Sequence, residues 1–253
     1  MLPVLFHIGS YPVGSWGLLL MVAFVAAAAR AVVAAEKLYG IPRDPLWDAS
    51  LYGLFGGVLG GRLAFVLLNL KQYLAHPGEI FAVWQGGMTS FGGLIGGVGV
   101  GLFVAKKRGL NVLDVCDAAG PSLAIGWFFG RIGCLLNGCC YGHACTQPWA
   151  MAFHPKDGPV TGLVHPTQLY DAFGMALTFA FLTLVMEKRR AFRGQLLLVF
   201  LLLFGLVRFI VEFWREQSGT ESVIAGLSTG QWASLAVAAV ALALWPKWSK
   251  AKL

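Results

Sequence analysis

The stretch Gly130-Arg131-Ile132-Gly133-Cys134-Leu135-Leu136-Asn137-Gly138-Cys139-Cys140-Tyr141-Gly142 directly follows an apolar run, residues 123–129. It places an arginine among glycines, an amide and three thiols. A charged side chain inside a bilayer costs ~2.5–3.5 kcal/mol on insertion scales, so it normally faces a polar cavity or a counter-ion. Glycine lets the backbone approach a ligand or another backbone closely. We therefore expect this stretch to form the wall of a ligand site at membrane depth.

The composition of the whole chain is that of a membrane protein. Of its 253 residues, 57% are hydrophobic and only 12% are charged, whereas soluble domains carry about 25% charged residues. The net charge of +7 comes from short basic clusters between apolar runs. Such clusters report the topology of a membrane protein, so we expect no nucleic-acid partner.

Seven apolar segments are long enough to cross ~30 Å of hydrocarbon as helices, the form that satisfies every backbone group in lipid. They lie near residues 14–35, 47–69, 88–105, 112–136, 167–186, 194–213 and 229–246. The sequence therefore predicts an all-α integral membrane protein, with one transmembrane catalytic domain over residues 1–253.

The basic residues in the connections, with Arg30 near the end of the first segment counted among them, predict the orientation. Thirteen fall on one side, in the first, third and fifth connections and at the C-terminus, and three fall on the other side. Because Lys and Arg concentrate in cytoplasmic loops, we expect a cytoplasmic C-terminus. The N-terminus and the loop of residues 137–166 are then expected in the periplasm.

Apart from Arg30, which is counted with the first connection, three arginines lie inside predicted segments: Arg62, Arg131 and Arg208. Arg208 and Glu212 are four residues apart, so they share a helix face and can pair. One interpretation is that each arginine snorkels to the interface beside a structural partner. The other, which we prefer because all three lie toward the outer ends of their helices, is that they bind an anionic phospholipid headgroup.

The cysteine spacing leaves several interpretations open. Cys134, Cys139, Cys140 and Cys145 have the spacing Cys-x4-Cys-Cys-x4-Cys, which lacks the Cys-x2-Cys pairs usual in zinc sites, so no metal is expected. The thiols are then apolar packing groups, partners in a disulfide from Cys139 or Cys140 to Cys145, or nucleophiles.

Two further features have two interpretations each. Gly92-Gly93 either pack against another helix or open a short break beside a ligand. His165, before Pro166 at a predicted helix start, is either a general base or a structural residue.

Six sequence blocks, in order across almost the whole chain, resemble the bacterial phosphatidylglycerol–prolipoprotein diacylglyceryl transferases. The Gly-Arg-Ile-Gly block at residues 130–133 is similar to the signature of that family. The blocks are Gly61–Leu63, Gly87–Gly97, Gly130–Gly142, His165–Asp171, Phe204–Glu216 and Gly226–Trp232.

This resemblance implies a seven-helix enzyme of the bacterial inner membrane. The enzyme transfers the diacylglyceryl group of phosphatidylglycerol to the thiol of a lipobox cysteine in a prolipoprotein, and it releases glycerol-1-phosphate. No cofactor is implied. The essential arginines of the family fall on Arg131 and Arg208, its acidic residue falls on Glu212, and further family positions fall on Arg215 and Asp117.

From the residues and the resemblance together, we expect two overlapping sets of site residues. The catalytic set is Arg131, Arg208, Glu212, Cys134, Cys139 and His165. The set that binds phosphatidylglycerol is Arg62, Gly92, Gly93, Asp117, Arg131, Asn137, Gly142, Arg208 and Arg215.

The chain departs from the family pattern at three positions. Phe91 stands where the family has a histidine, Cys134 where it has an asparagine, and Cys139 where it has a glutamate. The alternative function is therefore a relative that binds an anionic phospholipid but uses another acceptor, or that is not catalytic.

Overall fold

The computed structural model describes residues 2–9, 11–82, 86–154, 159–215 and 225–252, and it divides the chain into two compact units. The large unit contains residues 1–31 and 116–253, and the small unit contains residues 32–115. Whether both units form one catalytic domain stays a prediction. Glu216, the last residue of one motif block, lies outside the described residues.

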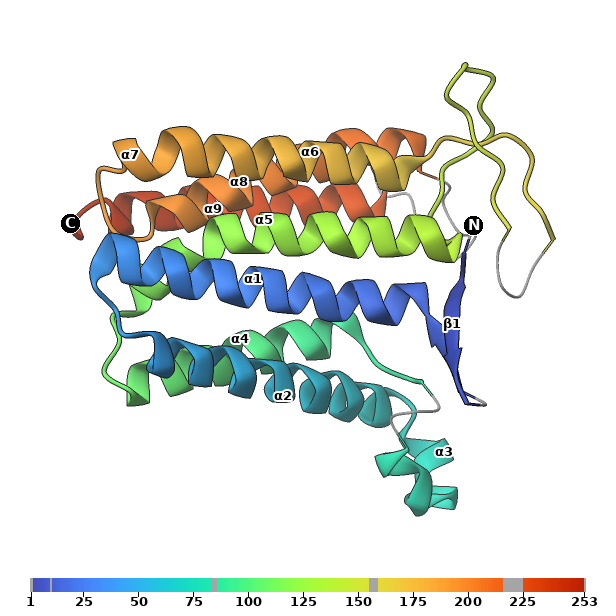
Figure 1. Cartoon of the computed structure of the whole chain (residues 1–253), viewed down its shortest axis with the longest axis horizontal. Helices are drawn as coiled ribbons and strands as arrows, with labels where there is room; N and C mark the ends of the chain where they lie inside the picture. The colour runs from blue at the N-terminus through green and yellow to red at the C-terminus, as the bar shows by residue number, and fades with distance from the viewer. Residues whose placement is uncertain (1, 10, 83–85, 155–158, 216–224, 253) are drawn as a thin grey trace. The chain divides into compact units, whose positions relative to one another are not determined.

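All seven predicted segments are helical, and their ends differ from the predicted ends by no more than four residues when the helix that begins at Thr167 is counted to Arg189 (Figure 1). Helix α6 continues through a π-helical turn, η3 (Leu182–Met186), into α7 (Glu187–Arg189), and α8 ends in the 3-10 turn η4 (Glu212–Trp214). The long helices are α1 (Ser15–Tyr39), α2 (Arg43–Leu68), α4 (Ser90–Lys107), α5 (Val112–Asn137), α6 (Thr167–Phe181), α8 (Gln195–Val211) and α9 (Thr229–Trp248).

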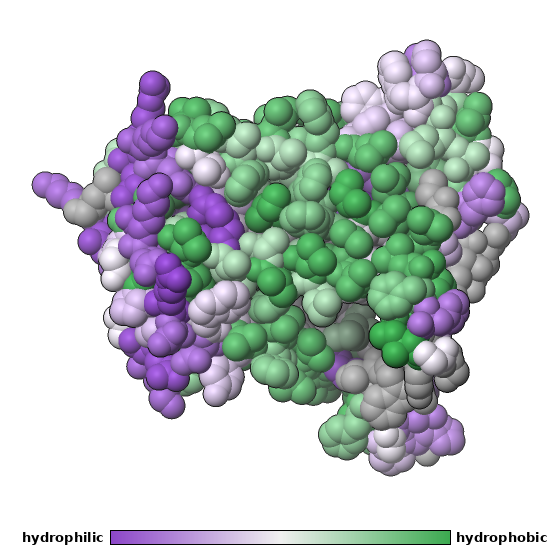
Figure 2. Space-filling model, viewed as in Figure 1, coloured by the Kyte–Doolittle hydropathy of each residue, from purple (hydrophilic) through white to green (hydrophobic). Residues whose placement is uncertain are grey.

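Within the described residues, six helical segments are long and apolar enough to cross a membrane, which confirms a multi-pass helical membrane protein. Helix α4 is not among the six, because its 18 residues include six glycines and two lysines, which lower its mean hydropathy. The seventh span therefore stays a prediction. In Figure 2, hydrophobic side chains cover the middle of the helices, and strongly hydrophilic ones gather at the helix ends beside α7 and the C-terminus.

Helices α2 and α4 of the small unit cross through their glycines. A Cβ atom on Gly60 would lie 2.5 Å from the carbonyl oxygen of Gly92, and a Cβ atom on Gly96 would lie 3.0 Å from the Cα of Gly60. Gly92 and Gly93 belong to the first turn of α4, where the side chain of Thr89 accepts a hydrogen bond from the Gly92 amide. The helix break proposed at these glycines is therefore wrong, and the packing interpretation is confirmed.

Some short elements were not predicted from the sequence. Strands β1 (Val4–Ile8) and β2 (Tyr11–Gly14) form an antiparallel hairpin before α1. A short helix, α3 (Leu70–Ala75), and a 3-10 turn, η1 (Pro77–Phe81), follow α2. Their sequences are too short to show a clear period.

The large unit holds the apolar core that positions the site. Helices α5, α6 and α8 pack around Ala124, Met175 and Phe200, and the rings of Trp127 and Phe204 meet edge to face at 4.8 Å. Asp117 fixes the start of α8, because its buried carboxylate accepts hydrogen bonds from the amides of Gly194 and Leu196, at 2.8 and 2.7 Å. These contacts set α5 against α8.

The helix crossing in the small unit leads to a stability prediction. Gly96→Ala should lower the unfolding temperature in detergent, because its Cβ would collide with the carbonyl oxygen of Gly56 and force α2 and α4 apart. Gly99→Ala is the matched control on the same helix, since a Cβ there meets nothing within 4 Å. Equal unfolding temperatures for the two variants would contradict a close helix crossing.

Candidate active site

Two buried arginines of the large unit converge on one carboxylate oxygen. The Oδ2 atom of Asp171 on α6 lies 3.0 Å from Nε of Arg131 on α5 and 2.5 Å from Nη1 of Arg208 on α8. The Asp171 side chain is 2% exposed, and the two arginine side chains are 12% and 10% exposed. Asp171 thus links α5, α6 and α8 through ion pairs.

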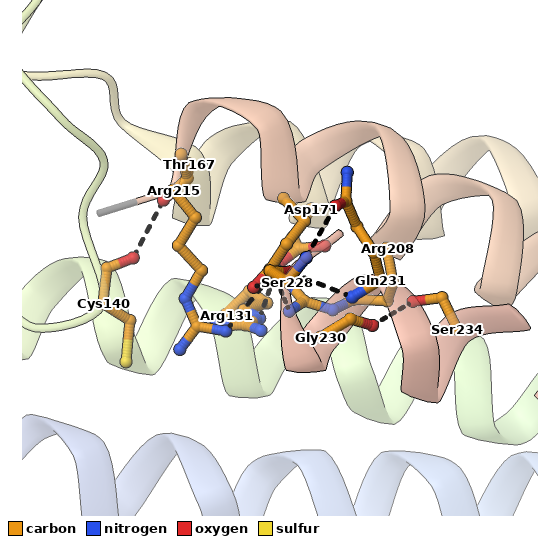
Figure 3. A network of polar contacts seen from close by, with 11 residues as sticks. Arg131, Cys140, Thr167, Asp171, Arg208, Arg215, Ser228, Gly230, Gln231 and Ser234 are labelled. Atoms are coloured by element: carbon orange, nitrogen blue, oxygen red, sulfur yellow. Dashed lines mark hydrogen bonds and ion pairs between the residues drawn. The ribbon is translucent and has the colours of Figure 1, made fainter. Parts of the chain in front are cut away.

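A second carboxylate continues the chain of charges. Nη2 of Arg208 lies 3.0 Å from Oε2 of Glu212, and Nη1 of Arg215 lies 3.6 Å from the same oxygen. The i,i+4 pair predicted between Arg208 and Glu212 is therefore present. The charges alternate in the order Arg131, Asp171, Arg208, Glu212, Arg215, and we call this chain of residues the ion network (Figure 3).

The start of α9 completes the surroundings of Glu212. Ser228 caps α9 through a capping box with Gln231, and its hydroxyl donates to Oε1 of Glu212 at 3.3 Å. Gly230 lies so close to the Glu212 carboxylate that a Cβ atom would collide with it. The small residues at this helix start therefore make room for the buried acid.

The ion network has more positive than negative groups. In the part of the chain that the structure describes, three guanidiniums face two carboxylates, which leaves one excess positive charge near the outer ends predicted for these helices. Oδ1 of Asp171 is buried and has no hydrogen-bond partner among the described residues. The network can therefore accept an anion together with a hydroxyl or amide donor.

The segment after α5 is held against the start of α6 by backbone contacts. Thr167 donates to the carbonyl of Cys140 at 2.9 Å, and Gln168 donates to that of Cys139 at 2.7 Å. The amide of Gly142 donates to the carbonyl of His165 at 2.8 Å. A side chain at Gly142 would collide with the carbonyl oxygen of Trp214, so this predicted site residue makes a close backbone approach.

Three of the five thiols gather in this segment. The Sγ atoms of Cys134, Cys139 and Cys140 lie within 4.8 Å of one another, and we call them the thiol cluster. All five cysteines are free thiols, so the disulfide considered for Cys145 is absent from this structure. Asn137 ends α5 and lies between Cys134 and the other two cysteines of the cluster.

His165 lies beside an apolar cavity rather than inside the ion network. The cavity has a volume of about 700 Å³ and is lined mainly by apolar residues of α6 and α8, including Phe173 and Ile210. The ring nitrogen Nδ1 of His165 is 3.1 Å from the hydroxyl of Tyr170. Burial lowers the pKa of His165 from its ordinary value, and the neighbouring His143 lowers it further, so the imidazole is neutral at pH 7.

Comparison with known proteins agrees with the resemblance seen in the motifs. The family model described as Prolipoprotein diacylglyceryl transferase matches residues 3–246. The chain belongs to this family.

Individual relatives cover nearly the same length. A protein of Methylobacillus flagellatus is 38% identical over 92% of this chain and 91% of its own length, and one of Bordetella bronchiseptica is 40% identical over 92% and 90%. A protein of Geobacter sulfurreducens is 34% identical over 90% and 88%. All three are named phosphatidylglycerol–prolipoprotein diacylglyceryl transferase.

Four predicted site residues of this family member have other partners in the structure. Arg62, in the small unit, donates to the backbone carbonyls of residues 79, 80, 86 and 87 and so holds the connection after α2. Asp117 accepts from the start of α8, and Gly92 and Gly93 pack α4 on α2. Their role in lipid binding stays a prediction.

Sequence reasoning left Asp171 out of the candidate site, although Asp171 holds both buried arginines. The sequence feature that could have identified Asp171 is its position as the fifth residue of an apolar helix. An ionisable residue within a membrane span is a functional candidate by default. Ser228, the partner of Glu212, carried a weaker signal, since a serine before a helix usually only caps it.

The ion network leads to a second prediction. Asp171→Asn should reduce the free energy of unfolding in mixed micelles by about 3–5 kcal/mol, because it leaves two buried arginines with one counter-ion. Asp44→Asn, at an exposed acid in the first turn of α2, is the matched control and should change little. If both variants unfold alike, Asp171 does not hold the helices together.

Proposed function

We propose that this chain is a transferase that moves the diacylglyceryl group of phosphatidylglycerol to a cysteine thiol of a prolipoprotein. Membership of the family and the names of its relatives support the reaction class. The observation in the structure that carries the proposal is the ion network, where three guanidiniums face two buried carboxylates.

The reaction needs a site that stabilises a departing phosphate. A sulfur–carbon bond forms between the acceptor thiol and glycerol C3 of the diacylglyceryl group. The bond from that carbon to the phosphate oxygen breaks, the thiol proton passes to a base, and glycerol-1-phosphate leaves. Negative charge grows on the phosphate oxygens in the transition state, so cations already fixed in place contribute most there.

In this proposal, the guanidiniums of Arg131 and Arg208 hold the phosphate. Together with Arg215 they share only two acids, Asp171 and Glu212, so the three guanidiniums are not fully neutralised. The planar fork of a guanidinium matches two phosphate oxygens. The unpaired Oδ1 of Asp171 then suits a hydroxyl of the headgroup glycerol.

The acyl part of the substrate fits the apolar cavity of the large unit. The cavity lies between α6 and α8, the two helices that carry Asp171 and Arg208. A lipid held by both features would have its charged headgroup at the network and apolar chains along Phe173 and Ile210.

The proton acceptor differs from the histidine implied by the family, because Phe91 occupies that position. We assign the role to His165, whose lowered pKa keeps it neutral and able to accept a proton at pH 7. His165 also lines the cavity, and its ring forms a hydrogen bond with the hydroxyl of Tyr170.

We further propose seven membrane spans in a bacterial inner membrane, with the N-terminus in the periplasm and the C-terminus in the cytoplasm. The thirteen-to-three distribution of basic residues supports the orientation. Helix α4, paired with α2 through glycines, would be the seventh span.

The phosphate role can be tested by charge-conserving substitutions. Arg131→Lys and Arg208→Lys should each lower the rate of transfer of labelled diacylglyceryl groups to a lipobox peptide by about 10²–10³-fold, because an ammonium cannot replace the guanidinium fork. Arg43→Lys, at an exposed ion pair with Glu36, is the control and should keep full activity.

The outcomes of this assay separate the competing functions. Full activity in both network variants would reject the phosphate role. Binding of phosphatidylglycerol by the unmodified protein without any transfer would support the alternative, a lipid-binding relative with another acceptor or without catalysis.

The orientation has its own test. A reporter enzyme that is active only in the periplasm should be active when fused after residue 149 and inactive when fused after residue 191. Residue 149 lies in the loop between α5 and α6, and residue 191 lies between α7 and α8. The reverse pattern would place the ion network at the cytoplasmic leaflet and contradict the proposed topology.

A further inference from the structure

The thiol cluster brings together three potential ligands from a short piece of chain. The Sγ atoms of Cys139 and Cys140 are 3.7 Å apart, and all three Sγ atoms lie within 4.8 Å of one another. The sequence spacing argued against zinc because Cys-x2-Cys pairs are missing. The fold nevertheless brings the three thiols together, because the chain reverses its direction after α5.

This reversal of the chain takes place at the end of α5. Cys134 lies in the last turn of the helix, and the chain then reverses through Gly138 and Cys140, whose φ angles are +73° and +65°. A left-handed conformation is costly for a residue with a side chain. The left-handed conformation of Cys140 is stabilised because the buried side chains of Thr167 and Gln168 donate hydrogen bonds to the carbonyls of Cys140 and Cys139.

The spacing of the sulfur atoms fits a metal better than a disulfide. A zinc–sulfur bond is ~2.3 Å long, so two thiolates in a tetrahedral site lie about 3.8 Å apart, whereas a disulfide needs ~2.0 Å. The 3.7 Å between Cys139 and Cys140 matches the first value. Small adjustments of the Cys134 side chain would complete a three-sulfur face.

Positive charge of the ion network lies beside the cluster. Arg131 lies three residues before Cys134 on α5, so the two side chains share a helix face, and both Arg131 and Arg215 act electrostatically on Cys140. Three thiolates with one divalent ion carry a single negative charge, which these guanidiniums can balance. Each of the three cysteines is partly exposed, so an ion can enter.

We propose that Cys134, Cys139 and Cys140 form a binding site for a thiophilic d10 cation such as Zn2+. The three thiolates supply three ligands, and the fourth position stays open to solvent or to a small ligand. This inference goes beyond the transferase reaction and does not depend on it. Cys116 and Cys145, both buried, take no part in the site.

The test uses the full chain in detergent, purified under a reductant that does not bind metal. Titration with Cd2+ should give one tightly bound ion per chain, counted by elemental analysis, and a thiolate-to-metal charge-transfer absorption. Zn2+ should compete for the same site. A count of reactive thiols before titration confirms that the cluster is reduced.

Matched variants assign the ligands. Cys134→Ser, Cys139→Ser and Cys140→Ser should each weaken Cd2+ binding by at least about 100-fold, since even changes next to metal ligands cost 10–100-fold. Cys116→Ser and Cys145→Ser carry the same substitution outside the cluster and should keep the affinity of the unmodified protein. A single symmetric peak in size-exclusion chromatography shows that a variant is folded.

Two results would overturn the proposal. One is the absence of the charge-transfer absorption in a reduced protein with five reactive thiols. The other is unchanged Cd2+ binding in a folded variant that lacks all three cluster cysteines. Either result would leave the cluster as packing thiols.

Discussion

The large unit depends on two buried carboxylates that are shared among three arginines. Each ion costs several kcal/mol to remove from water, and the cost is recovered only when charges of opposite sign are held at contact distance. Asp171 and Glu212 do this for Arg131, Arg208 and Arg215, over distances of 2.5–3.6 Å. Because the five residues come from α5, α6, α8 and the segment after α8, the pairing fixes these elements against one another in a setting where the hydrophobic effect between helices is weak.

The same pairing explains how a structural network can also serve chemistry. A fully neutralised network would have no affinity for an anion, and an isolated arginine would not stay buried. Three guanidiniums on two carboxylates meet both demands, since every arginine has a counter-ion and, within the described residues, one positive charge is left over for the phosphate that we propose binds there. Groups held in this way need little rearrangement when charge develops on a phosphate, which is the condition for electrostatic catalysis.

The sequence predicted the helices and part of this network, for a physical reason. Hydropathy and the i,i+4 pairing of Arg208 with Glu212 are local along the chain, so the sequence displays them directly. The ion pairs from Arg131 through Asp171 to Arg208 join three helices, and the periodicity of hydrophobic residues in the sequence does not reveal contacts between different helices. For the same reason, the sequence did not show that Asp117 accepts a hydrogen bond from the amide of Gly194, 77 residues further along the chain, at the start of α8.

The first turn of α6 connects the ion network with the positions where this chain departs from its family. Thr167 and Gln168 hold the backbone at Cys139 and Cys140, and Asp171 on the same helix holds the arginines. A cysteine at a family asparagine or glutamate position therefore changes groups beside the network without removing any of its charges. The replacement of the family histidine by Phe91 lies in the small unit, on α4. The departures thus fall on groups other than the charges that we propose hold the phosphate, and they leave those charges in place.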